Sequence, residues 1–169
     1  MIRVAILTVS DSVARGRRED LSGPALAQRC RELGWEVVCH AAVPDETEAI
    51  KKQLQTWADE KIASLILTTG GTGIAARDVT PEATRAILDR ELPGMGELMR
   101  AKGLEQTRFS VLSRATAGTR GRSLIVNLPG SPRGALYSLD VIRNLVPHVI
   151  DLLAGRTEHS GECETGGGQ

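Results

Sequence analysis

Short apolar runs alternate with amphipathic stretches along most of this chain, and that alternation is the feature that most restricts its fold. The runs "RVAILTVS" (3–10), "EVVCHAAV" (36–43) and "SLILTT" (64–69) are rich in β-branched and aliphatic residues, which predicts buried strands. A fourth strand, "SLIVNL" (123–128), is expected after a short hairpin turn at Arg120-Gly121. Apolar strands separated by helices predict an α/β fold with a parallel sheet covered on both faces.

The segments between these strands have helical periodicity and recognisable ends. A helix is expected over 22–33, where Ser22 can act as N-cap and Gly34 can end it. A second helix, from about 46 to 60, carries one apolar stripe formed by Ile50, Leu54, Trp57 and Ala58. Further helices are expected over about 81–91, near 95–103, and from Ser131 to Leu153 with a break at Pro147.

The length and composition indicate one globular domain. The chain has 169 residues, of which 41% are hydrophobic, and we assign residues 1–155 to the domain. Residues 156–169, "RTEHSGECETGGGQ", are polar and glycine-rich, so we expect a disordered tail.

Several partners and compartments are disfavoured by the composition. The 21 basic residues balance the 21 acidic ones, and four aromatic residues offer little for base stacking, so nucleic acid is not expected as a partner. No apolar run approaches the roughly 18 residues of a membrane span, and Asp11 follows the first apolar run too early for a signal peptide. The three cysteines (Cys30, Cys39 and Cys163) lack CxxC spacing, which favours reduced thiols and a cytoplasmic protein.

Polar residues gather where the predicted parallel strands end. The four strand ends deliver, in order, Ser10-Asp11, Pro44-Asp45-Glu46, Gly70 to Asp78, and Asn127 to Ser131. In open α/β sheets, ligands bind outside the carboxyl ends of the strands. The sequence therefore predicts a binding crevice at this edge, although Asp45 taken alone suits a helix N-cap better than a catalytic role.

The loop Gly70-Gly71-Thr72-Gly73 suits an anion, because glycines let backbone N–H groups approach phosphate oxygens closely. A helix starting at Thr80-Pro81 would add partial positive charge. A tight turn without a ligand is the simpler alternative. The Walker P-loop pattern is absent, and a dinucleotide fold is disfavoured because the glycines follow the third strand and Asp89 is expected inside a helix.

Asp78 lies just beyond this loop, where a carboxylate can hold Mg²⁺ together with phosphate oxygens. Asp45 is the candidate second acid. The alternatives for Asp78 are an N-cap or an ion pair with Arg77. No protein nucleophile motif is present, and His40, His148 and His159 lack ligand spacing. Arg114, Arg120 and Arg133 flank the later loops and could meet a second anionic ligand, or simply lie on the surface.

Five segments stand in the order found in one family: "AILTVSDS", "PDE", "LTTGGTGIAARDVTPEAT", "LSRATAGTRG" and "LIVNLPGSP". With them, residues 3–154 resemble the MogA/MoaB-like molybdopterin-binding proteins. The resemblance implies a three-layer α/β/α sandwich with a mostly parallel central sheet, and a homo-oligomer, either trimer or hexamer, with the trimer favoured. It also implies a nucleotidyltransferase that uses ATP and Mg²⁺ to adenylylate molybdopterin and releases pyrophosphate.

The resemblance assigns roles to residues that match the family's motifs. Asp45 and Asp78 would be catalytic and would hold Mg²⁺. The molybdopterin phosphate would attack, which accounts for the missing protein nucleophile. The nucleotide and molybdopterin would be bound by the other matching residues: Ser10, Asp11, Gly70, Gly71, Thr72, Gly73, Ser113, Arg114, Asn127, Pro129, Gly130 and Ser131.

The last segment, 131–154, is short and resembles MoaB and the gephyrin G domain more than MogA enzymes. Two functions therefore stay open: a molybdopterin adenylyltransferase, which the presence of both Asp45 and Asp78 favours, and a non-catalytic MoaB-type binder or scaffold. Either would work with the enzyme that next inserts molybdate.

Overall fold

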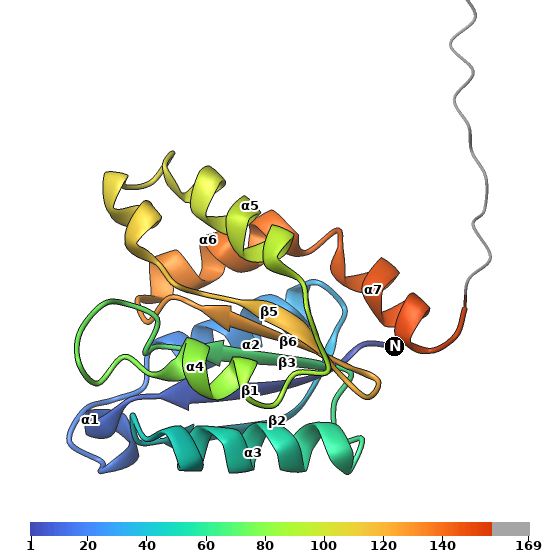
Figure 1. The fold of residues 1–169 in the computed structure, drawn as a ribbon, viewed down its shortest axis with the longest axis horizontal. Coiled ribbons are helices and arrows are strands. Elements are labelled where there is room, and N and C mark those ends of the chain that lie inside the picture. Colours follow the sequence, from blue (N-terminus) through green and yellow to red (C-terminus); the bar gives the residue numbers. More distant parts are fainter. Residues whose placement is uncertain (157–169) are drawn as a thin grey trace, which may run out of the picture.

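The central element of the protein is one twisted sheet with the strand order β2-β1-β3-β6-β5-β4 (Figure 1). The computed structural model describes residues 1–156; residues 157–169, on which the expectation of a disordered tail falls, lie outside the described residues. Strands β2, β1, β3 and β6 are parallel, whereas β5 and β4 pair antiparallel. The strands are β1 (Arg3–Val9), β2 (Glu36–Val43), β3 (Leu65–Thr69), β4 (Arg90–Glu91), β5 (Ala117–Arg120) and β6 (Ser123–Leu128).

Helices cover both faces of the sheet, which confirms the predicted three-layer α/β/α sandwich (Figure 1). One face packs against α2, α5, α6 and α7, and the other against α3 and α4. The helices are α1 (Asp11–Ala14), α2 (Ser22–Glu32), α3 (Thr47–Asp59), α4 (Thr80–Arg85), α5 (Pro93–Gly103), α6 (Pro132–Ile142) and α7 (Val146–Leu153), with a 3-10 helix, η1, at Arg108–Leu112. No helix within residues 1–156 is long and apolar enough to cross a membrane.

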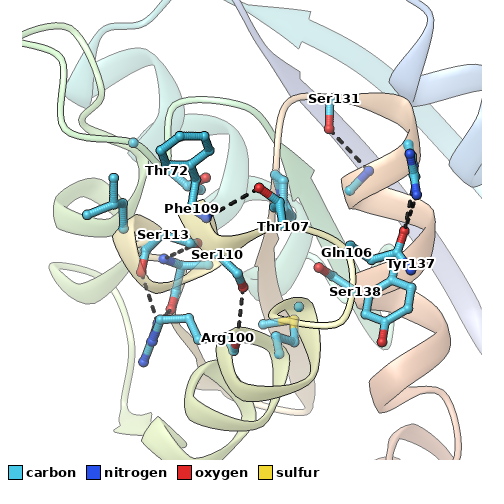
Figure 2. Close-up of a pocket in the computed structure, with 18 of the residues that line it drawn as sticks. Thr72, Arg100, Gln106, Thr107, Phe109, Ser110, Ser113, Ser131, Tyr137 and Ser138 are labelled. Carbon is cyan, nitrogen blue, oxygen red and sulfur yellow. Dashed lines mark hydrogen bonds between the residues drawn. The ribbon is translucent and has the colours of Figure 1, made fainter.

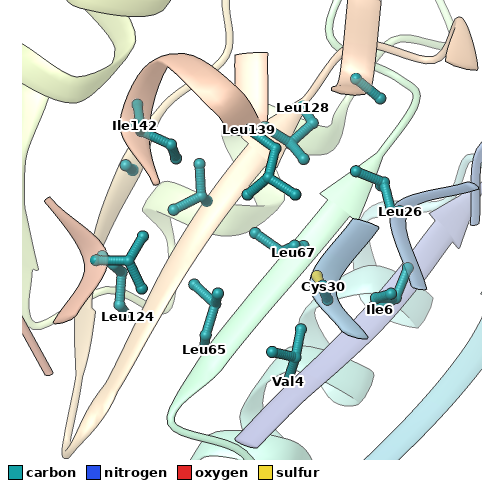
Figure 3. Close-up of a cluster of buried hydrophobic side chains, with 14 of the residues drawn as sticks. Val4, Ile6, Leu26, Cys30, Leu65, Leu67, Leu124, Leu128, Leu139 and Ile142 are labelled. Carbon is teal, nitrogen blue, oxygen red and sulfur yellow. The ribbon is translucent and has the colours of Figure 1, made fainter. Parts of the chain in front are cut away.

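Alternate residues of each central strand enter the two cores. On β1, Val4 and Ile6 point to the core under α2 and α6, which Figure 3 shows, while Ala5 and Leu7 point to the core under α3. Full burial of each large aliphatic side chain stabilises the fold by about 1.5–3 kcal/mol. The predicted α3 stripe is confirmed, because all four of its residues are buried.

One predicted helix boundary and one predicted N-cap are wrong. The helix expected over 81–91 ends at Arg85, and Asp89 lies outside it, where its N–H donates to the Thr119 carbonyl (2.8 Å) as the chain joins the sheet at β4. Ser22 is not an N-cap: it is buried in the first turn of α2, and Asp20 instead accepts from the Gly23 N–H (2.9 Å). At Asp89, pairing with a strand distant in sequence outweighs helix propensity. At Ser22, the neighbouring side chain of Asp20 takes the hydrogen bond expected of the N-cap.

Cys30 is buried in the core, and burial raises the pKa of its thiol to about 12. A thiol with that pKa stays protonated at neutral pH and is unreactive. Cys39 is half-buried on β2 and is also a free thiol.

Candidate functional site

A cavity of about 520 Å³ lies at the carboxyl ends of β1 and β3. The chain runs from β1 to β2 on one side of β1 and then returns to β3 on the other, so these two strand ends flank a topological switch point. We call this cavity the carboxylate cavity, because Asp45 and Asp78 line it. Its other lining residues are Thr8, Val9, Ser10, Val13, Arg18, Glu19, Asp20, Leu21, Ser22, Thr69, Gly70, Gly71, Gly130, Ser131 and Pro132.

A second cavity of about 470 Å³ opens between the loop 70–73, α5, η1 and α6 (Figure 2). We call the loop 70–73 the glycine loop. We call the second cavity the apolar cavity, since Met99, Phe109, Leu112, Ala115 and Pro129 form much of its wall. Polar side chains are spaced around this wall, and Figure 2 labels several of them: Thr72, Arg100, Gln106, Thr107, Ser110, Ser113, Ser131, Tyr137 and Ser138.

The two cavities meet at Ser131, the one described residue that lines both. The glycine loop divides between them: Gly70 and Gly71 line the carboxylate cavity, and Thr72 and Gly73 line the apolar cavity. The wall formed by this loop and Ser131 therefore has a separate chamber on each side.

The glycines at the end of β3 are required by both conformation and packing. Gly70 and Gly71 have φ values of 103° and 68°, in the region that favours glycine. A Cβ on Gly70 would overlap the Val9 carbonyl oxygen. Thr80, buried at the start of α4, donates from Oγ1 to the Gly70 carbonyl (2.9 Å) and from its N–H to the Gly71 carbonyl (3.1 Å). The loop is thus held tightly against β1 and α4.

The loop leaves backbone donors available. The Gly70 N–H donates to the Leu128 carbonyl (3.2 Å), but the N–H groups of Gly71, Thr72 and Gly73 donate to no acceptor within residues 1–156. The Ser131 Oγ accepts from the Gly134 N–H (3.1 Å), which leaves its hydroxyl proton free to donate. Together these groups can bind a phosphate at the junction.

Asp45 and Asp11 hold each other's backbone. The Asp11 N–H donates to Asp45 Oδ2 (2.9 Å), and the Asp45 N–H donates to Asp11 Oδ1 (3.1 Å). Arg77 donates from Nε and Nη2 to the two Asp11 oxygens (2.6 and 2.8 Å). Asp45 therefore does not cap α3, and Arg77 pairs with Asp11, not with Asp78.

The pKa values of Asp45 and Asp11 are shifted in opposite directions. Burial is the main cause that raises the pKa of Asp45, and the nearby charges of Asp11 and Asp78 raise it further. The hydrogen bond from Arg77 is the main cause that lowers the pKa of Asp11. Asp45 is thus the carboxylate of this pair that protonates more readily as the pH falls.

Asp78 lies close to the glycine loop, next to Gly73. Its Oδ2 accepts from the Ala75 N–H (2.9 Å), and a Cβ on Gly73 would lie 2.7 Å from that oxygen. The N-cap position of α4 is Val79, so Asp78 does not cap that helix. Two carboxylates beside a loop whose free N–H groups suit a phosphate are a suitable arrangement for Mg²⁺. No group of three His, Cys, Asp or Glu side chains within residues 1–156 could hold a metal alone, so Mg²⁺ here would need phosphate and water oxygens as well.

Arg114 lies outside the lining of both cavities and fastens the loop instead. It donates from Nε to the Gly73 carbonyl (2.7 Å) and from Nη2 to the Asp78 carbonyl (2.6 Å), and it pairs with Glu82. Its own N–H donates to the Thr72 carbonyl (2.9 Å). The expected ligand-binding arginine thus acts on the backbone that surrounds Asp78.

Asn127 also lies outside both cavities, and its side chain is fully buried. Its Nδ2 donates to the hydroxyl oxygens of Thr68 (3.0 Å) and Thr84 (2.9 Å), which joins β6 to β3 and α4. These contacts give Asn127 a structural role in the core, and its role in ligand binding stays a prediction.

Replacing Asn127 with alanine is expected to lower the free energy of unfolding by about 2–4 kcal/mol, since two buried hydroxyl groups lose the amide donor that they share. Urea unfolding followed by circular dichroism measures this change. A loss below about 0.5 kcal/mol would contradict the structural role.

Four of the remaining expected residues line one cavity or the other. Ser10 and Gly130 line the carboxylate cavity, and Ser113 and Pro129 line the apolar cavity. Arg133 also lines the apolar cavity, whereas Arg120 forms a bidentate pair with Asp59 at the opposite edge of the sheet. Most residues of the apolar wall, including Met99 and Phe109, belong to no local sequence motif that would have predicted them.

Comparisons with known proteins agree with this geometry. Residues 5–148 match the family model described as "Probable molybdopterin binding domain". The chain is 41% identical over 156 residues to the molybdopterin adenylyltransferase of Helicobacter pylori strain J99, in a match that covers 91% of this chain and 89% of that protein. It is 36% identical to the molybdopterin adenylyltransferase of Escherichia coli K12, with 91% and 86% covered.

Among solved structures, the fold is similar to that of the molybdopterin biosynthesis enzyme MoaB from Thermus thermophilus. The TM-score is 0.86 and the sequence identity is 52%, and the match covers 92% of this chain and 98% of that one.

Proposed function

The chain belongs to the molybdopterin-binding domain family, and we propose that it transfers AMP from Mg-ATP to the terminal phosphate of molybdopterin, releasing pyrophosphate. The observation that carries the proposal is the junction, where two cavities meet at Ser131 beside Asp45 and Asp78. Two substrates that react through their phosphates can each occupy one chamber if the two chambers meet where the phosphates react. The names and high coverage of the adenylyltransferase relatives support the same reaction.

The chemistry of each wall supports one assignment of the substrates. The carboxylate cavity suits the polyphosphate of ATP, because Mg²⁺ binds carboxylates together with phosphate oxygens. The apolar cavity suits the flat pterin ring, which can pack against Met99 and Phe109 while its heteroatoms meet the polar side chains around them. The phosphate of the pterin substrate and the α-phosphate of ATP would then face each other at Ser131.

The residues at the junction would orient both phosphates. The free N–H groups of Gly71, Thr72 and Gly73 would hold the phosphate oxygens, and the Ser131 hydroxyl would donate from the opposite side. Asp45 and Asp78 would hold Mg²⁺, which when bound neutralises charge on the departing pyrophosphate. A phosphate oxygen of molybdopterin attacks the α-phosphorus, so no side chain needs to act as nucleophile.

Replacing Arg77 with glutamine is expected to move the acidic limb of the pH–rate profile to higher pH. The positive charge of Arg77 lowers the pKa of Asp11 and Asp45, so its loss raises both values and the carboxylates become protonated at a higher pH. Activity that depends on ionised Asp45 is then lost at a higher pH than in the natural protein. The initial rate, measured between about pH 5 and 8, tests this; a limb that stays in place or moves to lower pH would count against it.

We further infer a cytoplasmic homo-oligomer, with a trimer as the expected form, that passes its product to a molybdate-inserting enzyme. The exposed apolar side chains of Leu104 and Val111, which line neither cavity, support self-association, since such groups are commonly covered at interfaces. Sedimentation velocity distinguishes a monomer, a trimer and a hexamer.

The reaction itself is tested anaerobically, because molybdopterin is sensitive to oxygen. The protein is mixed with molybdopterin and Mg-ATP, and pyrophosphate and the adenylylated pterin are separated by chromatography. Both products should form in equal amounts. Tight binding of molybdopterin without product would instead identify a carrier or scaffold protein on the same fold.

A further inference from the structure

The segment between α1 and α2 concentrates positive charge beside the carboxylate cavity. Three of its residues, Arg15, Arg17 and Arg18, are arginines within four positions, and all three are exposed. The segment is folded back on α1: the N–H groups of Arg17 and Arg18 both donate to the Ser12 carbonyl (2.8 and 3.2 Å), and Gly16 turns the chain with a φ of 70°. The backbone therefore holds the three arginines close to one another.

No carboxylate within residues 1–156 forms an ion pair with these three arginines, whereas half of the fourteen other arginines have such a partner. Seven other arginines are paired in this way: Arg29, Arg77, Arg85, Arg114, Arg120, Arg143 and Arg156. Arg15 lies close enough to Asp11 to help lower the pKa of that carboxyl group. The guanidinium groups of Arg17 and Arg18 remain available to an anionic ligand.

Arg18 is the one cationic side chain among the described residues that line the carboxylate cavity. Four acidic side chains line the same cavity, namely Glu19, Asp20, Asp45 and Asp78. Asp20 is already engaged, since it accepts from the Thr8 hydroxyl (2.6 Å) and the Gly23 N–H (2.9 Å). A polyphosphate entering a cavity with this excess of negative charge needs a cation besides Mg²⁺.

On the premise of the proposed function, we propose that Arg18, supported by Arg17, binds the β- and γ-phosphates of the nucleoside triphosphate. In the reaction, an oxygen of the pterin phosphate forms a bond to the α-phosphorus while the bond from that phosphorus to the bridging oxygen breaks. Pyrophosphate leaves with the bridging oxygen and its electron pair. A guanidinium group on the departing phosphates stabilises the charge that develops there, and its planar set of donors suits phosphate oxygens.

This subsite predicts which ligands depend on Arg18. Pyrophosphate and ATP carry the two phosphates concerned, whereas AMP lacks them. Isothermal titration calorimetry with Mg-pyrophosphate, and separately with AMP, is compared for the natural protein, Arg18→Gln, and the double variant Arg17→Gln/Arg18→Gln. The matched control is Arg122→Gln, an exposed arginine of the β5–β6 turn at the opposite edge of the sheet.

Arg18→Gln is expected to weaken Mg-pyrophosphate binding about tenfold and the double variant further, while AMP binding stays within about twofold. Arg122→Gln should bind both ligands as the natural protein does. The subsite is overturned if the natural protein does not bind pyrophosphate, if Arg18→Gln binds it unchanged, or if Arg122→Gln loses as much affinity. The last result would indicate a general effect of net charge.

Activity measurements separate this inference from the proposed function. An active enzyme should show a raised KM for ATP in Arg18→Gln and an unchanged KM for molybdopterin. If the natural protein forms no adenylylated pterin but its pyrophosphate affinity depends on Arg18, the proposed function fails and the phosphate subsite stands. If the enzyme is active and Arg18→Gln matches it in both assays, the subsite fails and the proposed function stands.

Discussion

Asp78→Asn is expected to lower the rate of adenylyl transfer by about a thousandfold and to leave the fold intact. Asparagine has nearly the shape of aspartate, and its carbonyl oxygen can still accept from the Ala75 N–H, so the loop should keep its conformation. What is lost is the negative charge beside the glycine loop. Without it, the site holds Mg²⁺ weakly and the charge on the departing pyrophosphate is poorly neutralised.

The matched control for this prediction is Asp89→Asn. Asp89 is also a loop carboxylate that accepts a backbone hydrogen bond, from the Gly121 N–H (2.7 Å), but it lies outside both cavities. Its variant should retain full activity. Initial rates at saturating Mg-ATP compare the activities of the two variants, and thermal melts show whether both are folded. If Asp78→Asn were active, Asp78 would have no part in the mechanism and the proposed magnesium site would have to move.

Gly70→Ala is expected to lower the free energy of unfolding by about 3 kcal/mol or more. Two costs add at this position: a φ of 103° that an L side chain rarely adopts, and overlap of the new Cβ with the Val9 carbonyl oxygen. That oxygen belongs to β1, so it cannot move without distorting the centre of the sheet. The variant should therefore unfold at a clearly lower urea concentration.

Gly34→Ala separates these two costs. Gly34 has a φ of 77° after α2, and a Cβ there would meet no atom within 4 Å, so this variant bears only the conformational penalty of about 1 kcal/mol. Equilibrium urea unfolding of both variants gives the difference. Equal losses would show that the approach of β1 to the loop contributes nothing, and that the glycine is needed for its backbone angle alone.

The elements that the sequence predicted best are those whose signals are local. The four parallel strands were expected from apolar runs of the right length, and the buried stripe of α3 from its helical spacing, and both are confirmed. The strand-end rule also predicts that Ser10, Asp45 and Gly70 lie at one edge of the sheet, and the structure brings them to one cavity. Their roles in binding and catalysis stay predictions.

Local signals misled where distant residues decide the outcome. The segment after Arg85 has helical composition, yet it pairs with β5 because the sheet offers backbone partners there. Asn127 follows the right strand for a ligand contact, but Thr68 and Thr84, 59 and 43 positions earlier in the chain, take its amide. Arg114 likewise donates to the Gly73 and Asp78 carbonyls, which lie far from it in the sequence.

The sequence alone thus determined the layered α/β fold, the family, and the position of the glycine loop, since strand length, helical spacing and glycine positions are read along the chain. Only the tertiary structure decided that two cavities share one wall at Ser131, that Met99 and Phe109 line one of them, and that Arg18 lines the other. The physical reason is that a cavity is defined by side chains from several elements, and no local pattern records which distant residues will face one another.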